Sequence, residues 1–131
     1  MRLLDDLNLD SIKAGDLIAG FARTCGVSFP DPALLANAAL AMDTQATVVL
    51  QTDAVVFARK GFVDDIPASG GFPPMKKLLA DFIEQGGTIW VCGPCIKARG
   101  ISPDDLIEEA TIMAGAQLNI AAIEADAVFV Y

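Results

Sequence analysis

The chain has 131 residues, of which 53% are hydrophobic, and it carries a formal net charge of −8. This length fits one domain with a sizeable core, and the acidic balance argues against nucleic acid or an anionic membrane surface as a partner. The chain has no histidine, which excludes Ser-His and Cys-His catalysis and imidazole metal sites. Its high hydrophobic content favours a sheet covered on both faces, a buried subunit interface, or both.

Targeting segments and cofactors are not expected. No apolar run reaches the ~18–20 residues of a membrane span, and residues 1–6 (MRLLDD) lack the apolar stretch of a signal peptide. We therefore expect a cytoplasmic protein whose thiols stay reduced and which has no membrane partner. Its three cysteines are too few for a four-cysteine zinc site, so we expect no metal and no other cofactor.

The first predicted elements are a helix and a strand. Apolar residues between 3 and 12 have roughly helical spacing, without a clear element. Asp31-Pro32 is then typical of a helix cap followed by proline at the first helical position, and it predicts an apolar helix over 33–42. A short, continuously apolar strand follows over 47–51.

A short helix and a long loop are predicted next. Thr52 or Asp53 can cap a helix over 54–60, which Gly61 would close. Residues 62–72 contain one proline and two glycines, and loops of this length are often mobile and close to functional sites.

The pattern then changes to an amphipathic helix and a buried strand. Pro73-Pro74 opens the helix, and Gly86-Gly87 ends it. The apolar stripe of this helix consists of Leu78, Leu79, Phe82 and Ile83. The β-branched and aromatic segment 88–92 then predicts a buried strand.

The remaining segments complete an alternation of strands and helices. A loop with two cysteines is followed by a helix from 103 to about 109, and residues 110–113 are either a short strand or a continuation of that helix. A helix over 116–124 and a terminal strand over 127–131 close the chain. Strands separated by helix-length segments predict an α/β fold with three layers, a mostly parallel sheet with helices on both faces.

Cys92-Gly93-Pro94-Cys95 is the best candidate for chemistry in this sequence. It begins where the predicted strand ends, and open α/β sheets carry their chemistry at the carboxyl ends of strands. A cysteine near a helix start is favoured as the thiolate, and Lys97 and Arg99 add positive charge nearby. Such a thiolate can attack a disulfide or take sulfane sulfur from a persulfide donor. In the competing structural interpretation, Cys92 is a buried strand residue and Cys95 a loop thiol.

The tetrapeptide matches the redox centre of thioredoxins, but its context differs. A thioredoxin-like domain has its dithiol early, before most of its sheet and a cis-proline loop, whereas here the pair comes late in the chain. We therefore expect no thioredoxin fold, although dithiol chemistry stays possible. Cys25 stands alone between Thr24 and Gly26, and we interpret it as a structural residue.

A wider resemblance covers about residues 33–131 and is carried by several segments in order. They are 34–42 (LLANAALAM), 46–51 (ATVVLQ), 71–74 (GFPP), 91–100 (VCGPCIKARG), 104–107 (DDLI) and 125–128 (ADAV). Taken together, these segments resemble DsrE/DsrF-like proteins. The resemblance implies a small α/β domain with a parallel-rich sheet, commonly assembled into trimers or hexamers.

The resemblance also implies a role for the cysteines. In the sulfur-relay branch of this family, a cysteine at the end of the fourth strand carries a persulfide between protein partners. Cys92 matches that position by its spacing to the following Arg-Gly pair, and Cys95 would be a second acceptor or a resolving thiol. Arg99, Lys97 and Gly93 would bind the sulfur anion. The implied partners are further copies of the chain and sulfur donor and acceptor proteins, so "carrier" describes the role better than "enzyme".

The chain departs from this family at its beginning. The family opens with a strand and a polar loop, where residues 17–22 form at most a poor strand. We therefore expect a single domain over 1–131, with an atypical segment at 1–30 and a DsrE-like core at 31–131. Two other functions stay possible: a dithiol–disulfide redox protein that uses both cysteines, and a non-catalytic oligomeric or small-ligand-binding subunit.

Overall fold

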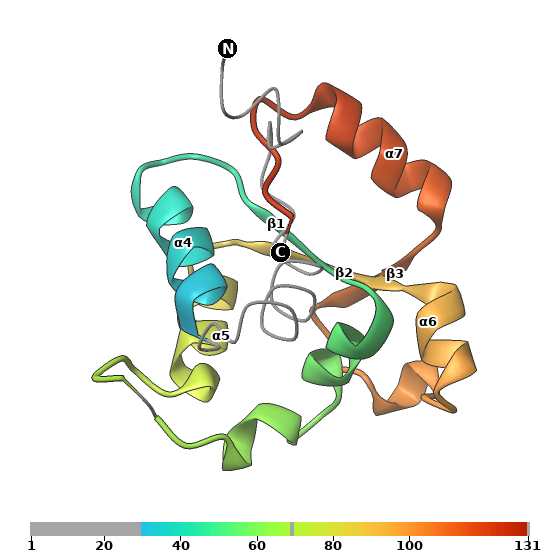
Figure 1. Cartoon of the computed structure of the whole chain (residues 1–131), viewed down its shortest axis with the longest axis horizontal. Helices are drawn as coiled ribbons and strands as arrows, with labels where there is room; N and C mark the ends of the chain where they lie inside the picture. Colours follow the sequence, from blue (N-terminus) through green and yellow to red (C-terminus); the bar gives the residue numbers. More distant parts are fainter. Residues whose placement is uncertain (1–29, 69, 131) are drawn as a thin grey trace.

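The computed structural model describes residues 30–68 and 70–130, so the predictions for the first segment, Cys25 included, lie outside the described residues. Helices and strands alternate, as predicted (Figure 1). The α-helices are α4 (Pro30–Ala41), α5 (Met75–Glu84), α6 (Gly93–Ala98) and α7 (Gly115–Glu124). The strands are β1 (Thr47–Leu50), β2 (Thr88–Cys92) and β3 (Ala110–Met113), and the 3-10 helices are η2 (Thr52–Ala58), η3 (Phe62–Asp65) and η4 (Pro103–Asp105).

The described strands form one parallel sheet in the order β1-β2-β3. Leu50 is paired with Val91, and Val91 with Ile112, so the carboxyl ends of the strands meet at the same end of the sheet. Alternate residues of a strand point to opposite faces, which puts Leu50 and Val91 on one face and Val49 and Trp90 on the other. Helices α4 and α5 lie on one side of the sheet and α7 on the other (Figure 1). The predicted three-layer α/β fold is therefore confirmed.

The main core lies between the first face of the sheet and the helices α4 and α5. The predicted stripe of α5 faces this core: Leu78 and Phe82 are each 3% exposed, and Leu79 and Ile83 are half-buried. Because these residues recur every three or four positions, they lie on one side of the helix. Gly86 follows the helix with φ +85°, a left-handed conformation that glycine adopts without steric penalty.

The second face of the sheet is covered by α7. Val49 and Val128 are buried on this face, and Trp90 is half-buried. The outer side of α7 is open in this chain, where Ile120 is 57% and Ile123 76% exposed. Apolar residues therefore occur on both sides of α7, and only one side faces the sheet.

Two segments after the cysteines bear on the predictions. The first differs from the predicted helix, and the second adopts one of the two predicted alternatives. The helix predicted over 103–109 is only the short η4. Ser102 and Asp105 form a reciprocal capping box at its start, and it ends early because Leu106 is extended and makes an antiparallel bridge with Arg59. Residues 110–113 form the strand β3, one of the two expected alternatives, because they pair with β2.

The short helix predicted over 54–60 is the 3-10 helix η2, which begins earlier. Neither Thr52 nor Asp53 caps it; Gln51 precedes its first turn, and its side chain makes no capping bond. The carboxylate of Asp53 is bonded to Arg99 instead. The cap prediction was wrong because it considered only the neighbouring residues in the chain.

The prediction of a terminal strand over 127–131 is wrong for residues 127–130, which form no strand. Within these residues only Val128 occupies a bridge position. Its side chain is 6% exposed and lies at the same cleft as Val49 and Trp90. The apolar pattern of this segment therefore reflects packing against the second face of the sheet rather than a strand of its own.

Candidate functional site

Cys92 lies at the carboxyl end of the central described strand. It is the last residue of β2 and is paired with Met113 of β3. Helix α6 begins at the next residue, and Pro94 lies in its first turn, where the fixed φ of proline suits a helix start. The segment predicted as a cysteine loop is therefore the first turn of a helix.

The two thiols of this segment are reduced and half-buried. Both Cys92 and Cys95 pack against the main core, and Ile96, at 4% exposure, anchors the helix between them and Arg99. Helix α6 is therefore packed on the core, while both cysteine residues keep part of their surface exposed. Accessibility and a defined position are what a thiol needs to exchange sulfur with a partner.

Gly93 brings the start of α6 close to β3. A Cβ atom at this position would lie 3.2 Å from Cγ2 of Ile112 and 3.6 Å from the carbonyl oxygen of Met113. The first of these distances is shorter than ordinary van der Waals contact, so a side chain would push the helix or Ile112 away. The packing of α6 therefore leaves little room for a side chain here, and anion binding by Gly93 stays a prediction.

Arg99 joins α6 to the segment that follows β1. Its Nε and Nη2 donate to Oδ1 of Asp53 at 3.1 and 2.6 Å, and its Nη1 donates to the carbonyl oxygen of Cys95 at 3.1 Å. The side chains of Arg99 and Asp53 are 31% and 56% exposed. Three of the five N–H groups of the guanidinium are used in these contacts. Lys97 is exposed in the last turn of α6.

Asp53 is a site residue that the sequence interpretation missed. It follows Thr52, whose φ of +52° lies in the left-handed region that β-branched residues rarely adopt. Because β1 and β2 are parallel and Leu50 is paired with Val91, the turn after β1 leaves the sheet beside Cys92. The available signal was the position of Asp53 just after the carboxyl end of a predicted strand.

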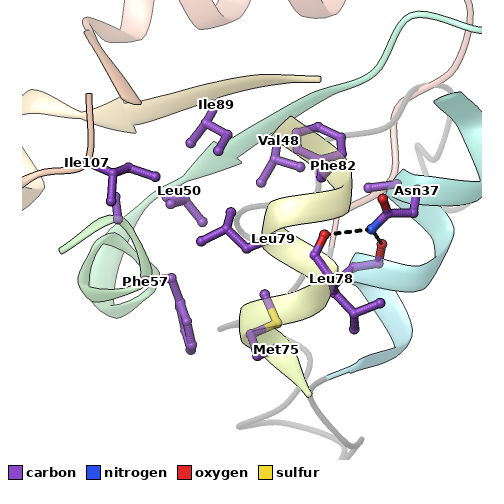
Figure 2. A pocket seen from close by; sticks show the side chains of 13 residues that line it. Asn37, Val48, Leu50, Phe57, Met75, Leu78, Leu79, Phe82, Ile89 and Ile107 are labelled. Carbon is purple, nitrogen blue, oxygen red and sulfur yellow. Dashed lines mark hydrogen bonds between the residues drawn. The ribbon is translucent and has the colours of Figure 1, made fainter. Parts of the chain in front are cut away.

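A small cavity in the main core is separate from the cysteines (Figure 2). Its volume is about 30 Å³, room for about one or two waters. Figure 2 shows apolar side chains around it, such as Leu50 from β1 and Leu79 from α5. The amide of Asn37 donates to the carbonyl oxygens of Ala33 and Leu78, each at 3.0 Å. The cavity is a packing void rather than a ligand site.

A wider cleft, of about 420 Å³, lies between α7 and the second face of the sheet, and neither cysteine lines it.

Among residues 30–68 and 70–130, no three His, Cys, Asp or Glu side chains are grouped so that they could hold a metal ion. Within the same part of the chain, no helix is long and apolar enough to cross a membrane.

Comparison with known sequences gives a family and several relatives. The family model described as DsrE/DsrF-like matches residues 32–131. An uncharacterized protein of Methanopyrus kandleri, MK0008, is 39% identical over 70 residues, which are 53% of this chain and 54% of that protein. Two uncharacterized proteins of Methanocaldococcus jannaschii, MJ0989 and MJ0760, are 50% identical over 40 residues and 34% identical over 83 residues.

The matched segments cover only part of each relative. They cover 30% and 63% of this chain for MJ0989 and MJ0760, and 35% and 30% of those proteins. The chain therefore spans between about a third and about half of the length of these curated relatives. Among solved structures, the YchN protein of E. coli is similar, with a TM-score of 0.63 and 23% identity, covering 77% of this chain and 84% of that one. At this identity the likeness concerns the fold.

Proposed function

The chain belongs to the DsrE/DsrF-like family, and on this basis we propose that it carries sulfur in a relay, with Cys92 as the residue that forms the persulfide. One observation carries the proposal: Cys92 is a reduced, half-buried thiol at the carboxyl end of the central parallel strand. Parallel α/β sheets hold reacting groups at this end, because the loops that follow the strands converge there.

In the proposed transfer, the Cys92 thiolate attacks the terminal sulfur of a donor persulfide, R–S–SH. A bond forms between Sγ and that sulfur, the S–S bond of the donor breaks, and the donor leaves as the thiolate R–S⁻. Cys92 then holds the sulfur as Cys–S–SH and yields it when an acceptor thiolate attacks the same terminal sulfur. Each step exchanges one S–S bond for another, so no oxidant or reductant is consumed.

The neighbouring residues assist this transfer. Cys95, one turn into α6, serves as a second acceptor or as the resolving thiol. Lys97 and the remaining N–H groups of Arg99 stabilise the sulfur anion, since hydrogen bonds between charged groups are the stronger ones. Gly93 contributes to the same anion site and keeps the start of α6 against β3.

Intact-mass measurement after incubation with a persulfide donor tests the proposal. We expect a gain of about 32 Da, one sulfur atom, on the wild-type chain. The gain should be lost in Cys92→Ser and retained in Cys95→Ser, which is the matched control. Absence of the adduct with several donors, or its retention in Cys92→Ser, would contradict the proposal.

A second candidate function is dithiol–disulfide exchange. It is favoured by the spacing of the two reduced thiols, which are separated by two residues at the junction of β2 and α6. The same mass measurement distinguishes it, because oxidation to an internal disulfide removes two hydrogens, about 2 Da, and a reductant restores them.

The proposed partners are sulfur donor and acceptor proteins and further copies of the chain. We propose the outer side of α7 as the contact between copies, because Glu124 is the single charged residue of that helix. Two copies with the same net charge of −8 repel each other least where surfaces with few charges meet. Reduced thiols are maintained in the cytoplasm, which we propose as the location.

A further inference from the structure

We infer that Asp53 determines which sulfur donors react at Cys92, because its pairing with Arg99 disfavours small anionic donors. A persulfide delivered by a docked protein would then be accepted, and a free dianion such as thiosulfate would be disfavoured. The biological meaning of this inference rests on the proposed function. Its main test, however, measures the reactivity of Cys92 without any sulfur transfer.

The ion pair puts a carboxylate beside the cysteine segment. Oδ1 of Asp53 lies 2.6 Å from Nη2 of Arg99, and Nη1 of the same guanidinium lies 3.1 Å from the carbonyl oxygen of Cys95. Two hydrogen bonds thus connect the carboxylate to the turn of α6 that carries the second thiol. An incoming anion would have to compete with Asp53 for the guanidinium.

The backbone holds Asp53 in this position from both ends of η2. At the first end, Thr52 keeps a φ of +52°, and a β-branched residue persists in that conformation only where its surroundings require it. At the other end, the backbone N–H of Ile107 donates to the carbonyl oxygen of Ala58 at 2.8 Å. Helix η2 also packs against α6. The fold therefore fixes the backbone position of Asp53, and the hydrogen bonds with Arg99 hold its carboxylate.

The electrostatic effect follows from the charges of the pair. Asp53 and Arg99 together are neutral, in a chain with a net charge of −8. Removing the carboxylate leaves one positive charge at the site, and removing the guanidinium leaves one negative charge. At a protein surface, a unit charge within roughly 10 Å of a reacting thiol changes the encounter rate with a monoanion by about two- to fourfold. The effect is larger for a dianion.

Alkylation by iodoacetate, an anion, and by the neutral iodoacetamide tests the inference. The ratio of the two rates at Cys92 corrects for changes in its exposure and nucleophilicity. We would measure it in a Cys25→Ser/Cys95→Ser background and locate the adduct by peptide mapping. Asp53→Asn should raise the ratio about threefold, Arg99→Gln should lower it by a similar factor, and the double variant should return to the parent value.

Salt and a matched variant serve as controls. The differences in the alkylation ratio between the variants and the parent chain should disappear in ~1 M salt, where the Debye length is ~3 Å. Asp64→Asn removes a carboxylate from another exposed ion pair, with Lys76 at 3.4 Å, and should leave the ratio unchanged. If these variants only lost structure, the ratio of the two alkylation rates would change in the same direction in Asp53→Asn and in Arg99→Gln. A shift of that kind, or no difference from Asp64→Asn, would overturn the inference.

A thiosulfate arm connects the inference to the proposed function. The Cys92 thiolate attacks the outer sulfur of thiosulfate, an S–S bond forms, and sulfite leaves. This reaction should be about tenfold faster in Asp53→Asn than in the parent chain. If the alkylation ratios shift as expected and no donor forms a persulfide, the proposed function fails and the role of Asp53 stands. If a persulfide forms on Cys92 and the alkylation ratios do not change, the proposed function stands and the role of Asp53 fails.

Discussion

Gly87 is a residue at which one methyl group changes the packing of the core. A Cβ atom there would lie 2.4 Å from both Cε1 and Cζ of Phe82, whose ring is 3% exposed in the main core. The glycine is required for close approach, because the ring is surrounded and cannot turn away. At Thr52 the constraint lies in the backbone instead, because this branched residue adopts a left-handed conformation.

Gly87→Ala should lower the free energy of unfolding by about 1–3 kcal/mol, the usual effect of overpacking a core. Urea unfolding followed by circular dichroism measures this loss. Gly115→Ala is the control: a Cβ there meets no atom of the described structure within 4 Å, so the change should stay within about 0.5 kcal/mol. Equal losses in both variants would contradict the packing argument.

At the scale of elements, a side-chain amide joins α4 to α5. Nδ2 of Asn37 on α4 donates to the carbonyl oxygen of Leu78 on α5 at 3.0 Å, and Oδ1 accepts from Nε2 of Gln85 at 2.9 Å. The amide also lines the small cavity between these helices and the sheet (Figure 2). It therefore holds two helices together at a place where apolar packing is incomplete.

Asn37→Ala should destabilise the fold by about 1–2 kcal/mol, because it removes these hydrogen bonds and enlarges the cavity. Thermal or urea unfolding gives the value. Asn119→Ala, on the exposed part of α7, is the matched control and should change the stability by less than about 0.5 kcal/mol. A neutral Asn37→Ala would show that the amide does not join the helices.

At the level of the whole molecule, an acidic chain exposes large apolar side chains on one helix. The chain carries a net charge of −8, whereas the outer side of α7 presents Ile120 and Ile123. Apolar surface without charge is typical of contacts between subunits. The proposed assembly of identical chains therefore has a specific surface at which it can be disrupted.

Ile123→Lys should dissociate the proposed oligomer, because two lysines would be buried at a symmetric contact without a partner. Sedimentation velocity measures the assembly state. Met42→Lys is matched in exposure, with 77% for Met42 against 76% for Ile123, and should leave the assembly intact. A wild-type chain that sediments as a monomer, or equal dissociation of both variants, would exclude α7 as the contact.

The fold class and the place of Cys92 at the end of a strand follow from local sequence patterns. The stripe of α5 and the apolar run of β2 depend on side-chain periods of 3.6 and 2 residues, which are visible among neighbours in the chain. The end of α5 was also predictable, because the glycine pair that follows the helix is a local signal in the sequence. The family resemblance, read from short segments in order, was confirmed over residues 32–131.

The residues around the thiols, in contrast, depend on contacts between distant parts of the chain. The sequence of residues 110–113 fits a strand or a helix equally, since so short an apolar segment shows no clear periodicity. Pairing with β2 makes it a strand. Asp53 and Arg99 are 46 positions apart, so no local pattern connects them. Their ion pair exists because β1 and β2 run parallel and in register, which brings the turn after one strand beside the helix after the other.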